Sequence, residues 1–86
     1  MYSKKTIIVN ESGLHARPAS MLVQFAKQFP EKISIVGNGK EVDPKHIIEL
    51  LTAGLKKSTE IEVRVTGENE ETVCNSVVDF IANLSE

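Results

Sequence analysis

The sequence predicts an α+β fold with the element order βαββαβα, in which a four-stranded antiparallel sheet is covered on one face by three helices. Segments of alternating hydrophobicity, typical of half-buried strands, are interspersed with segments of helical period. The chain has 86 residues, the length of one domain, so we expect a single domain over residues 1–86. Such an open-faced β-sandwich has a small core, and we expect functional groups at loops and helix ends.

A strand and an amphipathic helix are predicted first. Residues 6–9 are β-branched for the most part, which is typical of a strand, and the turn-forming residues 10–13 end it. From Ala16 onward, apolar residues recur at intervals of three and four. This spacing predicts a helix with one buried face that ends near Pro30.

A β-hairpin and a short helix are predicted next. The alternating residues 33–35 and the short segment 40–42 flank the turn-forming sequence Gly-Asn-Gly, so these two strands should pair. Asp43 is a good N-cap residue, and Pro44 suits the first position of a helix. Gly54 is placed to end this helix after about two turns.

The last part of the chain predicts one more strand and one more helix. Residues 60–66 alternate between polar and apolar side chains, and Gly67 ends this strand. Asn69 can cap the final helix. We expect its buried stripe to contain Val73, Val77, Phe80, Ile81 and Leu84.

Composition and charge exclude several classes of partner. With 10 basic and 12 acidic residues the formal charge is −2, which gives no general attraction to nucleic acid or to an anionic membrane. No apolar run approaches the roughly 20 residues of a membrane helix, so we expect no membrane insertion. The one cysteine, Cys74, cannot form an internal disulfide, and no secretory signal is recognisable. We therefore expect a cytoplasmic protein.

Metal and RNA ligands have little support in the sequence. His15, His46 and Cys74 could be imagined as a zinc set, but no two of them have the short spacing of metal ligands, so we expect no metal. RNA-binding sheets stack bases on aromatic residues of their strands, whereas the three phenylalanines here fall in predicted helices. We therefore expect no nucleic-acid partner.

The segment from Gly13 to Ser20 places an imidazole in a strand-to-helix loop, with an arginine two residues later. A helix N-terminus offers N–H groups without intrahelical acceptors and the positive end of the helix dipole, which together stabilise an anion such as phosphate. We expect the backbone amides of Ala16 and Arg17 to approach phosphoryl oxygens, and the Arg17 guanidinium to neutralise their charge. Pro18 fits a helix start, where no N–H is needed.

His15 could act as a nucleophile in this position. The positive end of the helix should favour the uncharged imidazole, whose ring nitrogen has a lone pair for attack on phosphorus. A single histidine near a helix start is, however, more often an ordinary surface or capping residue. The residue types alone leave both interpretations open.

Three motifs and the element order belong together. The motifs are Gly-Leu-His-Ala-Arg-Pro-Ala at residues 13–19, Asn-Gly-Lys at residues 38–40, and Gly54. Together they resemble the HPr family, the histidine phosphocarriers of the bacterial phosphoenolpyruvate:sugar phosphotransferase system (PTS). The resemblance implies that His15 accepts a phosphoryl group on Nδ1 from phosphorylated enzyme I and passes it to IIA domains of sugar permeases. It also implies that Arg17 is the charge partner of His15 and that the protein is a carrier and not an enzyme. We expect no cofactor, and a monomer.

A docking surface is expected beside the histidine. The predicted short helix has apolar residues on too many sides for all of them to be buried easily: Ile47, Ile48, Leu50 and Leu51. The alternative, in which all four pack into the core, fits the pattern equally well. The resemblance implies that this helix and the outer side of the first helix form one patch that binds partners. Its residues would be Ser20, Gln24, Lys27, Ile47, Ile48 and Leu51.

His46 departs from the family pattern. Low-GC Gram-positive HPr proteins have a regulatory serine at this position, which a kinase phosphorylates, whereas His46 has no hydroxyl. We therefore expect that regulation to be absent, and His46 to be a surface residue rather than a second phosphocarrier histidine. Two alternatives to the sugar carrier stay open: a regulatory binding module with the same fold, and a carrier of a nitrogen-related PTS branch.

Overall fold

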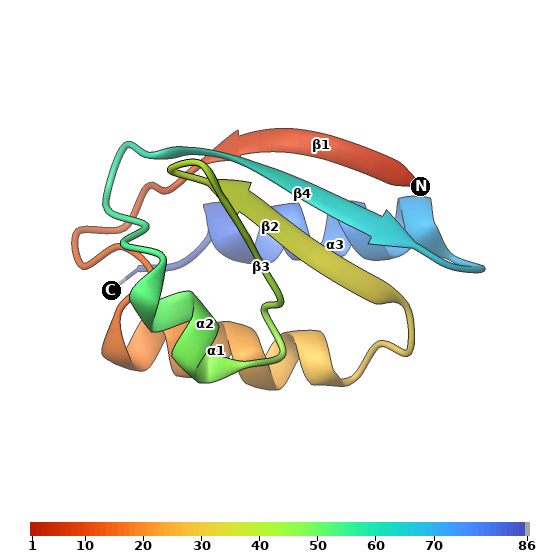
Figure 1. The fold of residues 1–86 in the computed structure, drawn as a ribbon, viewed down its shortest axis with the longest axis horizontal. Coiled ribbons are helices and arrows are strands. Elements are labelled where there is room, and N and C mark those ends of the chain that lie inside the picture. The colour runs from red at the N-terminus through yellow and green to blue at the C-terminus, as the bar shows by residue number, and fades with distance from the viewer. Residues whose placement is uncertain (86) are drawn as a thin grey trace.

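The computed structural model describes residues 1–85 and confirms the order βαββαβα (Figure 1). The strands are β1 (Tyr2–Ile7), β2 (Lys32–Gly37), β3 (Lys40–Val42) and β4 (Glu60–Thr66). The helices are α1 (Ala16–Lys27), α2 (Ile47–Thr52) and α3 (Glu70–Ala82). Each predicted element is present, although several of them begin or end at other residues than predicted.

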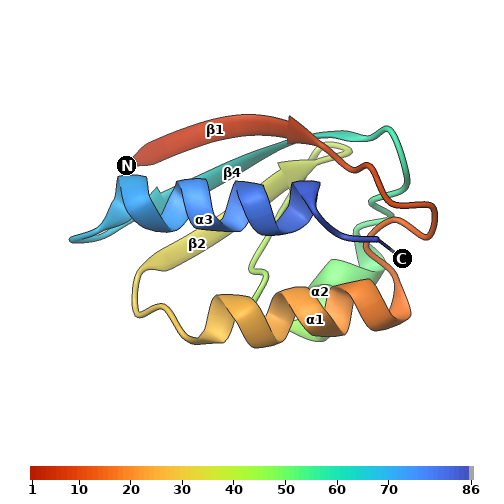
Figure 2. The same cartoon turned by 180° about the vertical axis from the view of Figure 1, so that it is seen from behind.

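All four strands form one antiparallel sheet in the order β1-β4-β2-β3. The inner strands β4 and β2 pair with each other, and β1 and β3 form the two edges. Figures 1 and 2 show the three helices on one side of the sheet, with the other face uncovered. The architecture is therefore the predicted open-faced β-sandwich.

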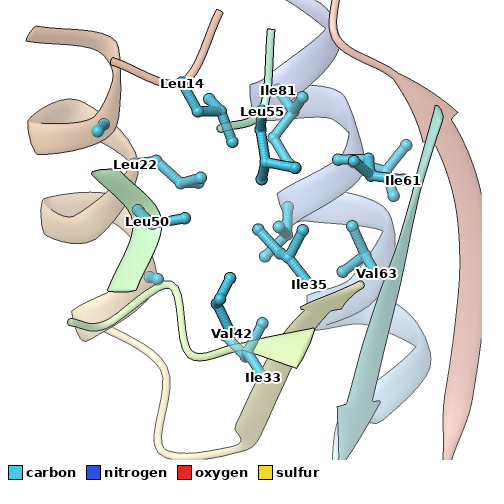
Figure 3. Packing of buried hydrophobic residues seen from close by; sticks show 14 of the residues in the cluster. Leu14, Leu22, Ile33, Ile35, Val42, Leu50, Leu55, Ile61, Val63 and Ile81 are labelled. Carbon is cyan, nitrogen blue, oxygen red and sulfur yellow. The ribbon is translucent and has the colours of Figure 1, made fainter. Parts of the chain in front are cut away.

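The core lies between the inner strands and the helices. Alternate residues of β2 and β4 are buried on the side that faces the helices, as a period of two requires. They are Ile33, Ile35, Ile61, Val63 and Val65. Helix residues cover them, among them Leu22 of α1, Leu50 of α2 and Ile81 of α3 (Figure 3). Full burial of an aliphatic side chain of this size stabilises the fold by about 1.5–3 kcal/mol.

The first strand differs from its prediction at both ends. It runs over Tyr2–Ile7, whereas the β-branched residues predict residues 6–9. Ile8 lies beyond the strand but is fully buried. Its N–H donates to the carbonyl oxygen of Thr59 (3.0 Å), and its carbonyl oxygen accepts the N–H of Ser58 (2.7 Å). The apolar run therefore marks the point where the chain leaves the sheet and enters the core.

The first helix ends at Lys27 and not near Pro30. A proline disfavours helical backbone at the preceding residue, here Phe29, so the helix stops earlier. The segment that follows is held by Lys45, whose Nζ donates to the carbonyl oxygens of Phe29 (2.6 Å) and Glu31 (2.8 Å). Because Lys45 precedes α2 in the chain, it ties the end of α1 to the start of α2.

The second helix begins later than predicted. Asp43 and Pro44 predict a start at these residues, but α2 begins at Ile47, with His46 in the N-cap position. Asp43 closes the preceding turn instead, because its Oδ1 accepts the N–H of Lys45 (2.8 Å). An Asx turn and an N-cap use the same side-chain oxygen, so the local sequence favours both structures equally.

The turn between β2 and β3 is confirmed, and it also caps α2. The side-chain amide of Asn38 donates to the carbonyl oxygens of Gly54 (2.8 Å) and Ala53 (3.3 Å). The ammonium of Lys40 donates to the carbonyl oxygen of Thr52 (3.4 Å). These carbonyls follow or end the helix, where intrahelical donors are lacking. The hairpin and the short helix therefore stabilise one another.

The third helix is confirmed with two differences. Asn69 occupies its N-cap position, but the side chain makes no capping hydrogen bond to the described helix; the backbone N–H donates to Oε2 of Glu31 (3.2 Å). Leu84 lies beyond the end of α3 but is still buried. Phe80 is only partly buried, and its ring stacks on that of Phe25 with centroids 4.3 Å apart. This ring pair joins α3 to α1.

Candidate functional site

Two loops that are far apart in the sequence lie side by side where β1 ends and β4 begins (Figures 1 and 2). They span residues 8–15 and 53–59. The N–H of Leu14 in the first loop donates to the carbonyl oxygen of Leu55 in the second (2.8 Å). Figure 3 shows both leucine side chains beside Ile81 in the core. The core therefore anchors the two loops to one another.

The close approach of the loops depends on Gly13. Its φ is +63°, and a Cβ at this position would lie 2.5 Å from the carbonyl oxygen of Leu55 and 2.8 Å from Cα of Lys56. Asn10 holds the same turn from the other side. Its side-chain amide donates to the carbonyl oxygen of Gly13 (2.7 Å), and its backbone carbonyl oxygen accepts the N–H of Gly13 (3.1 Å). The backbone that leads to His15 is therefore fixed.

His15 lies in the N-cap position of α1 with an extended backbone (φ −127°, ψ 154°). Its carbonyl oxygen accepts the N–H of Ala19 (3.4 Å), and its side chain is exposed. Within residues 1–85 the imidazole makes no capping hydrogen bond. The capping role is therefore wrong for this side chain, and the ring is presented to solvent at the positive end of the helix.

Ala16, the first residue of α1, has a φ of +39°, in the left-handed region that residues other than glycine rarely adopt. Such a conformation costs about 1–3 kcal/mol and persists where the surrounding structure imposes it, most often at functional sites. Here Leu14 on one side and Pro18 and Ala19 on the other are buried and hold the backbone. The orientation of the peptide after His15 is therefore set by packing.

The first turn of α1 suits an anion. It contains Arg17 and no acidic residue. The amides of Ala16 and Arg17 belong to the first turn, whose N–H groups have no acceptor within the helix. The Arg17 side chain is exposed, as is that of His15. The contact of these groups with a phosphoryl group stays a prediction.

A hollow of about 230 Å³ adjoins His15. The two loops and α2 line it with Ser12, Leu14, His15, Leu51, Gly54, Leu55 and Lys56. This volume is smaller than that of the clefts which enclose whole small molecules, so a small surface group is the suitable occupant. Ser12 and Lys56 were not among the predicted site residues. No local signal marks them, because the contact between the loops arises only in the folded chain.

The predicted docking residues lie on two neighbouring helices, since α1 packs against α2. Ile48 is 68% exposed, Ile47 and Leu51 are partly buried, and Leu50 is fully buried. The alternative in which all four enter the core is therefore wrong, most clearly for Ile48. The three predicted residues of α1 are also exposed: Ser20, Gln24 and Lys27.

His46 lies at the edge of this predicted docking patch. It lines a second hollow, of about 360 Å³, together with Lys27 of α1 and Ile48 of α2. Its side chain is exposed, with Nε2 3.6 Å from Oδ2 of Asp43. His46 is therefore a surface residue at the start of α2, as predicted.

An ion pair joins the two loops of the site at their outer side. The ammonium of Lys57 donates to Oε1 of Glu11. This hydrogen bond and the attraction between the two charges hold the pKa of the Glu11 carboxyl below its ordinary value. An exposed pair of this kind contributes little to stability, but it neutralises both charges.

The described part of the chain contains no candidate metal site and no candidate membrane span. Within residues 1–85, no three His, Cys, Asp or Glu side chains converge where they could hold a metal ion. Across the same residues, no helix combines the length and the apolar character needed to cross a membrane. The Cys74 thiol is buried in the core, which raises its pKa, and it donates to the carbonyl oxygen of Val63 (3.5 Å).

An open-faced β-sandwich with an exposed histidine before its first helix, followed by an arginine in the first turn, has the features of a single-histidine phosphocarrier. The comparison of the chain with family models agrees. The model described as "PTS HPr component phosphorylation site" matches residues 2–83. The chain therefore belongs to the PTS HPr family.

Solved structures of other proteins share this fold. HPr-C-His from Thermoanaerobacter tengcongensis is 32% identical, with a TM-score of 0.89 over 95% of this chain and 92% of that chain. The histidine-containing phosphocarrier protein of Mycoplasma is 29% identical, with a TM-score of 0.87 over 95% and 93%. Crh, a catabolite repression protein of Bacillus subtilis described as a dimer with a swapping domain, is 27% identical, with a TM-score of 0.75 over 100% and 99%. These similarities confirm the predicted fold and family.

Proposed function

We propose that this protein carries a phosphoryl group on Nδ1 of His15. The group would come from phosphoenolpyruvate through phosphorylated enzyme I and pass to the IIA domains of sugar permeases. The observation that carries the proposal is the exposed imidazole of His15 at the start of α1, directly before Ala16 with its left-handed backbone and two residues before Arg17. Membership of the PTS HPr family supports the same function.

The transfer is a displacement at phosphorus. The lone pair on Nδ1 of uncharged His15 forms the new N–P bond while the bond between phosphorus and the donor breaks, and the electron pair of that bond leaves with the donor. Nε2 keeps its proton. In the second transfer the N–P bond to His15 breaks as the acceptor attacks. The imidazole is regenerated, so the protein is a carrier and not an enzyme.

Arg17 and the first-turn amides would stabilise the charge on the phosphoryl oxygens. In the transition state that charge spreads over three oxygens, which hydrogen-bond donors in fixed positions can meet. The site is exposed to water, where an ionic contact contributes about 0.2–1 kcal/mol. Contacts of this strength hold the group without trapping it. The next partner can therefore remove it.

Partner docking is assigned to the patch of Ser20, Gln24, Lys27, Ile47, Ile48 and Leu51. An apolar centre at Ile48 with polar residues around it suits a transient complex. Leu51 also lines the hollow of His15, so the patch extends to the phosphorylation site. In this proposal the protein acts as a cytoplasmic monomer without a cofactor.

Incubation with phosphoenolpyruvate and enzyme I tests the proposal. We expect about one acid-labile phosphate per chain, located on His15 by mass spectrometry, and none in the His15→Ala variant. His46→Ala is the matched control, because it removes the other histidine, and it should be phosphorylated as the unchanged protein is. Phosphate that persists in His15→Ala would overturn the proposal.

A regulatory binding module is the second candidate, favoured by the similarity to Crh. Such a module would bind partner proteins without taking up phosphate at His15, so the same incubation separates the two functions. A carrier of a nitrogen-related branch would be phosphorylated but would pass the group to a nitrogen-related IIA domain. Transfer to isolated IIA domains of both kinds decides between these branches.

A further inference from the structure

We propose that Lys56 is a second cation that binds the phosphoryl group carried by His15. The inference rests on the proposed function, because it concerns the same site. Lys56 and His15 come from different loops and line the same hollow of about 230 Å³. No acidic residue lines this hollow among residues 1–85, so nothing there competes with a phosphoryl group for the ammonium.

The position of Lys56 is fixed by its backbone. Its Cα lies against Gly13, so close that a Cβ on the glycine would be only 2.8 Å away. The carbonyl oxygen of Leu55 accepts the N–H of Leu14 (2.8 Å), and the carbonyl oxygen of Lys56 accepts the N–H of Thr59 (3.1 Å). The backbone of Lys56 is therefore held in a fixed position beside the loop that contains His15.

Lys56 also differs from the lysines around it in what its ammonium contacts. Lys57 pairs with Glu11, Lys40 donates to a backbone carbonyl at the end of α2, and Lys45 donates to two backbone carbonyls after α1. Lys56 is exposed and makes no side-chain hydrogen bond or ion pair with any residue in 1–85. Its charge is therefore available to a ligand in the hollow.

A lysine ammonium is suited to this role. It is a compact charge with three donors on a flexible four-carbon stem, so it can follow phosphoryl oxygens without imposing a fixed geometry. During transfer the N–P bond forms at His15 as the donor's bond to phosphorus breaks, and Lys56 keeps its proton throughout. Lys56 therefore stabilises the phosphorylated state over the free state, and raises the occupancy of His15 at equilibrium.

The test measures the equilibrium in which the protein and phosphoenolpyruvate form phosphorylated protein and pyruvate. A trace of enzyme I catalyses the reaction in both directions. We expect Lys56→Gln to lower the equilibrium constant for phosphorylation of His15 about two- to fivefold at low salt, the range of an exposed ionic contact. Lys56→Arg keeps the positive charge, so its equilibrium constant should be close to that of the unchanged protein. The matched control is the double variant Glu11→Gln with Lys57→Gln, which removes a neighbouring exposed ion pair without changing the net charge of the two loops, and it should leave the constant unchanged.

Salt and kinetics add two further criteria. The difference between Lys56→Gln and the unchanged protein should vanish near 1 M salt, where the Debye length is about 3 Å. Equal equilibrium constants for the two proteins would overturn the inference, and so would a slower approach to an unchanged equilibrium, which would place Lys56 in partner docking. Failure of the unchanged protein to be phosphorylated would overturn the proposed function itself, so the two failures are distinguishable.

Discussion

The side-chain amide of Asn10 donates a hydrogen bond of 2.7 Å to the carbonyl oxygen of Gly13. Asn10 is buried, and its backbone carbonyl accepts the N–H of the same glycine, so one residue closes the turn that precedes His15. Its Oδ1 is buried without a hydrogen-bond partner among residues 1–85. A buried unpaired acceptor costs about 1–3 kcal/mol. Asn10 therefore fixes the turn and partly destabilises the fold.

Two substitutions at Asn10 should separate these effects. Asn10→Ala loses the donor to Gly13 but also removes the unpaired oxygen, so we expect the free energy of unfolding to fall by only about 1 kcal/mol. Asn10→Asp keeps the shape of the side chain but buries a carboxylate, which cannot donate a hydrogen bond to Gly13. This variant should lower the free energy of unfolding by about 2 kcal/mol or more at pH 7. Urea denaturation measures both. Equal losses would show that a buried, unpaired oxygen at this position carries no cost.

Gly13→Ala should destabilise the protein more than Gly39→Ala. Both glycines have positive φ, +63° and +75°, so the strain from backbone conformation is similar. At Gly13 the new Cβ would meet the backbone of Leu55 and Lys56, whereas at Gly39 no atom of residues 1–85 lies within 4 Å of it apart from the neighbouring residues in the chain. We expect losses of about 1 kcal/mol at Gly39 and about 3 kcal/mol or more at Gly13. A loss at Gly13 no larger than at Gly39 would contradict the close approach of the two loops.

Ile48→Glu should slow phosphoryl transfer from enzyme I without unfolding the protein. Ile48 is 68% exposed, so its replacement leaves the core intact and should change the free energy of unfolding by less than about 0.5 kcal/mol. A charge at the centre of an apolar contact should weaken docking by about tenfold or more. Ile7→Glu, at a 47% exposed position of the uncovered sheet face, is the control. The rates should be measured with this protein at concentrations too low to saturate enzyme I. Equal transfer rates for the two variants would refute the docking role.

The Glu70 carboxyl should contribute to stability at neutral pH and not in acid. The N–H of Gly67 and the Met1 amino group hydrogen-bond to it and hold its pKa below the ordinary value of 4.5. A lowered pKa in the folded state stabilises the fold above the unfolded-state pKa, and this contribution is lost as the pH falls through the folded-state value.

Thermal unfolding of Glu70→Gln checks this expectation. The variant should have a lower Tm than the unchanged protein at pH 7, and the difference should shrink below about pH 4. Glu68→Gln, an exposed neighbour, controls for the loss of one negative charge. A difference in Tm that is the same at pH 7 and pH 3 would contradict a stabilising role of the ionised carboxyl.

The sequence predicts the strands and helices well where one periodicity dominates. The alternation of residues 60–66 predicts both ends of β4 correctly. The helical spacing after Ala16 predicts the first residue of α1. The predicted start of α2 is wrong because the Asp43 side chain can either cap a helix or close a turn. The contact that decides between these two structures is long-range. Lys45 binds carbonyls at the end of α1, which no local pattern reveals.

The candidate site was predicted in part for the same reason. His15, Ala16 and Arg17 are contiguous, so the sequence is sufficient to group them. Lys56 joins them because its loop packs against theirs, for example through the hydrogen bond between Leu14 and Leu55, two residues that both enter the core. The pattern of α2 could not decide whether Ile48 is buried, because that depends on how the helix sits against α1.

The uncovered side of the sheet also offers a practical route to attach this protein to a surface. Ser34 lies between the buried Ile33 and Ile35 and opposite Arg64, on the side away from the helices. A cysteine introduced at Ser34 would react with a dye or a resin, while the native thiol of Cys74 stays shielded inside. Molecules immobilised in this way would keep their histidine end open to visiting proteins.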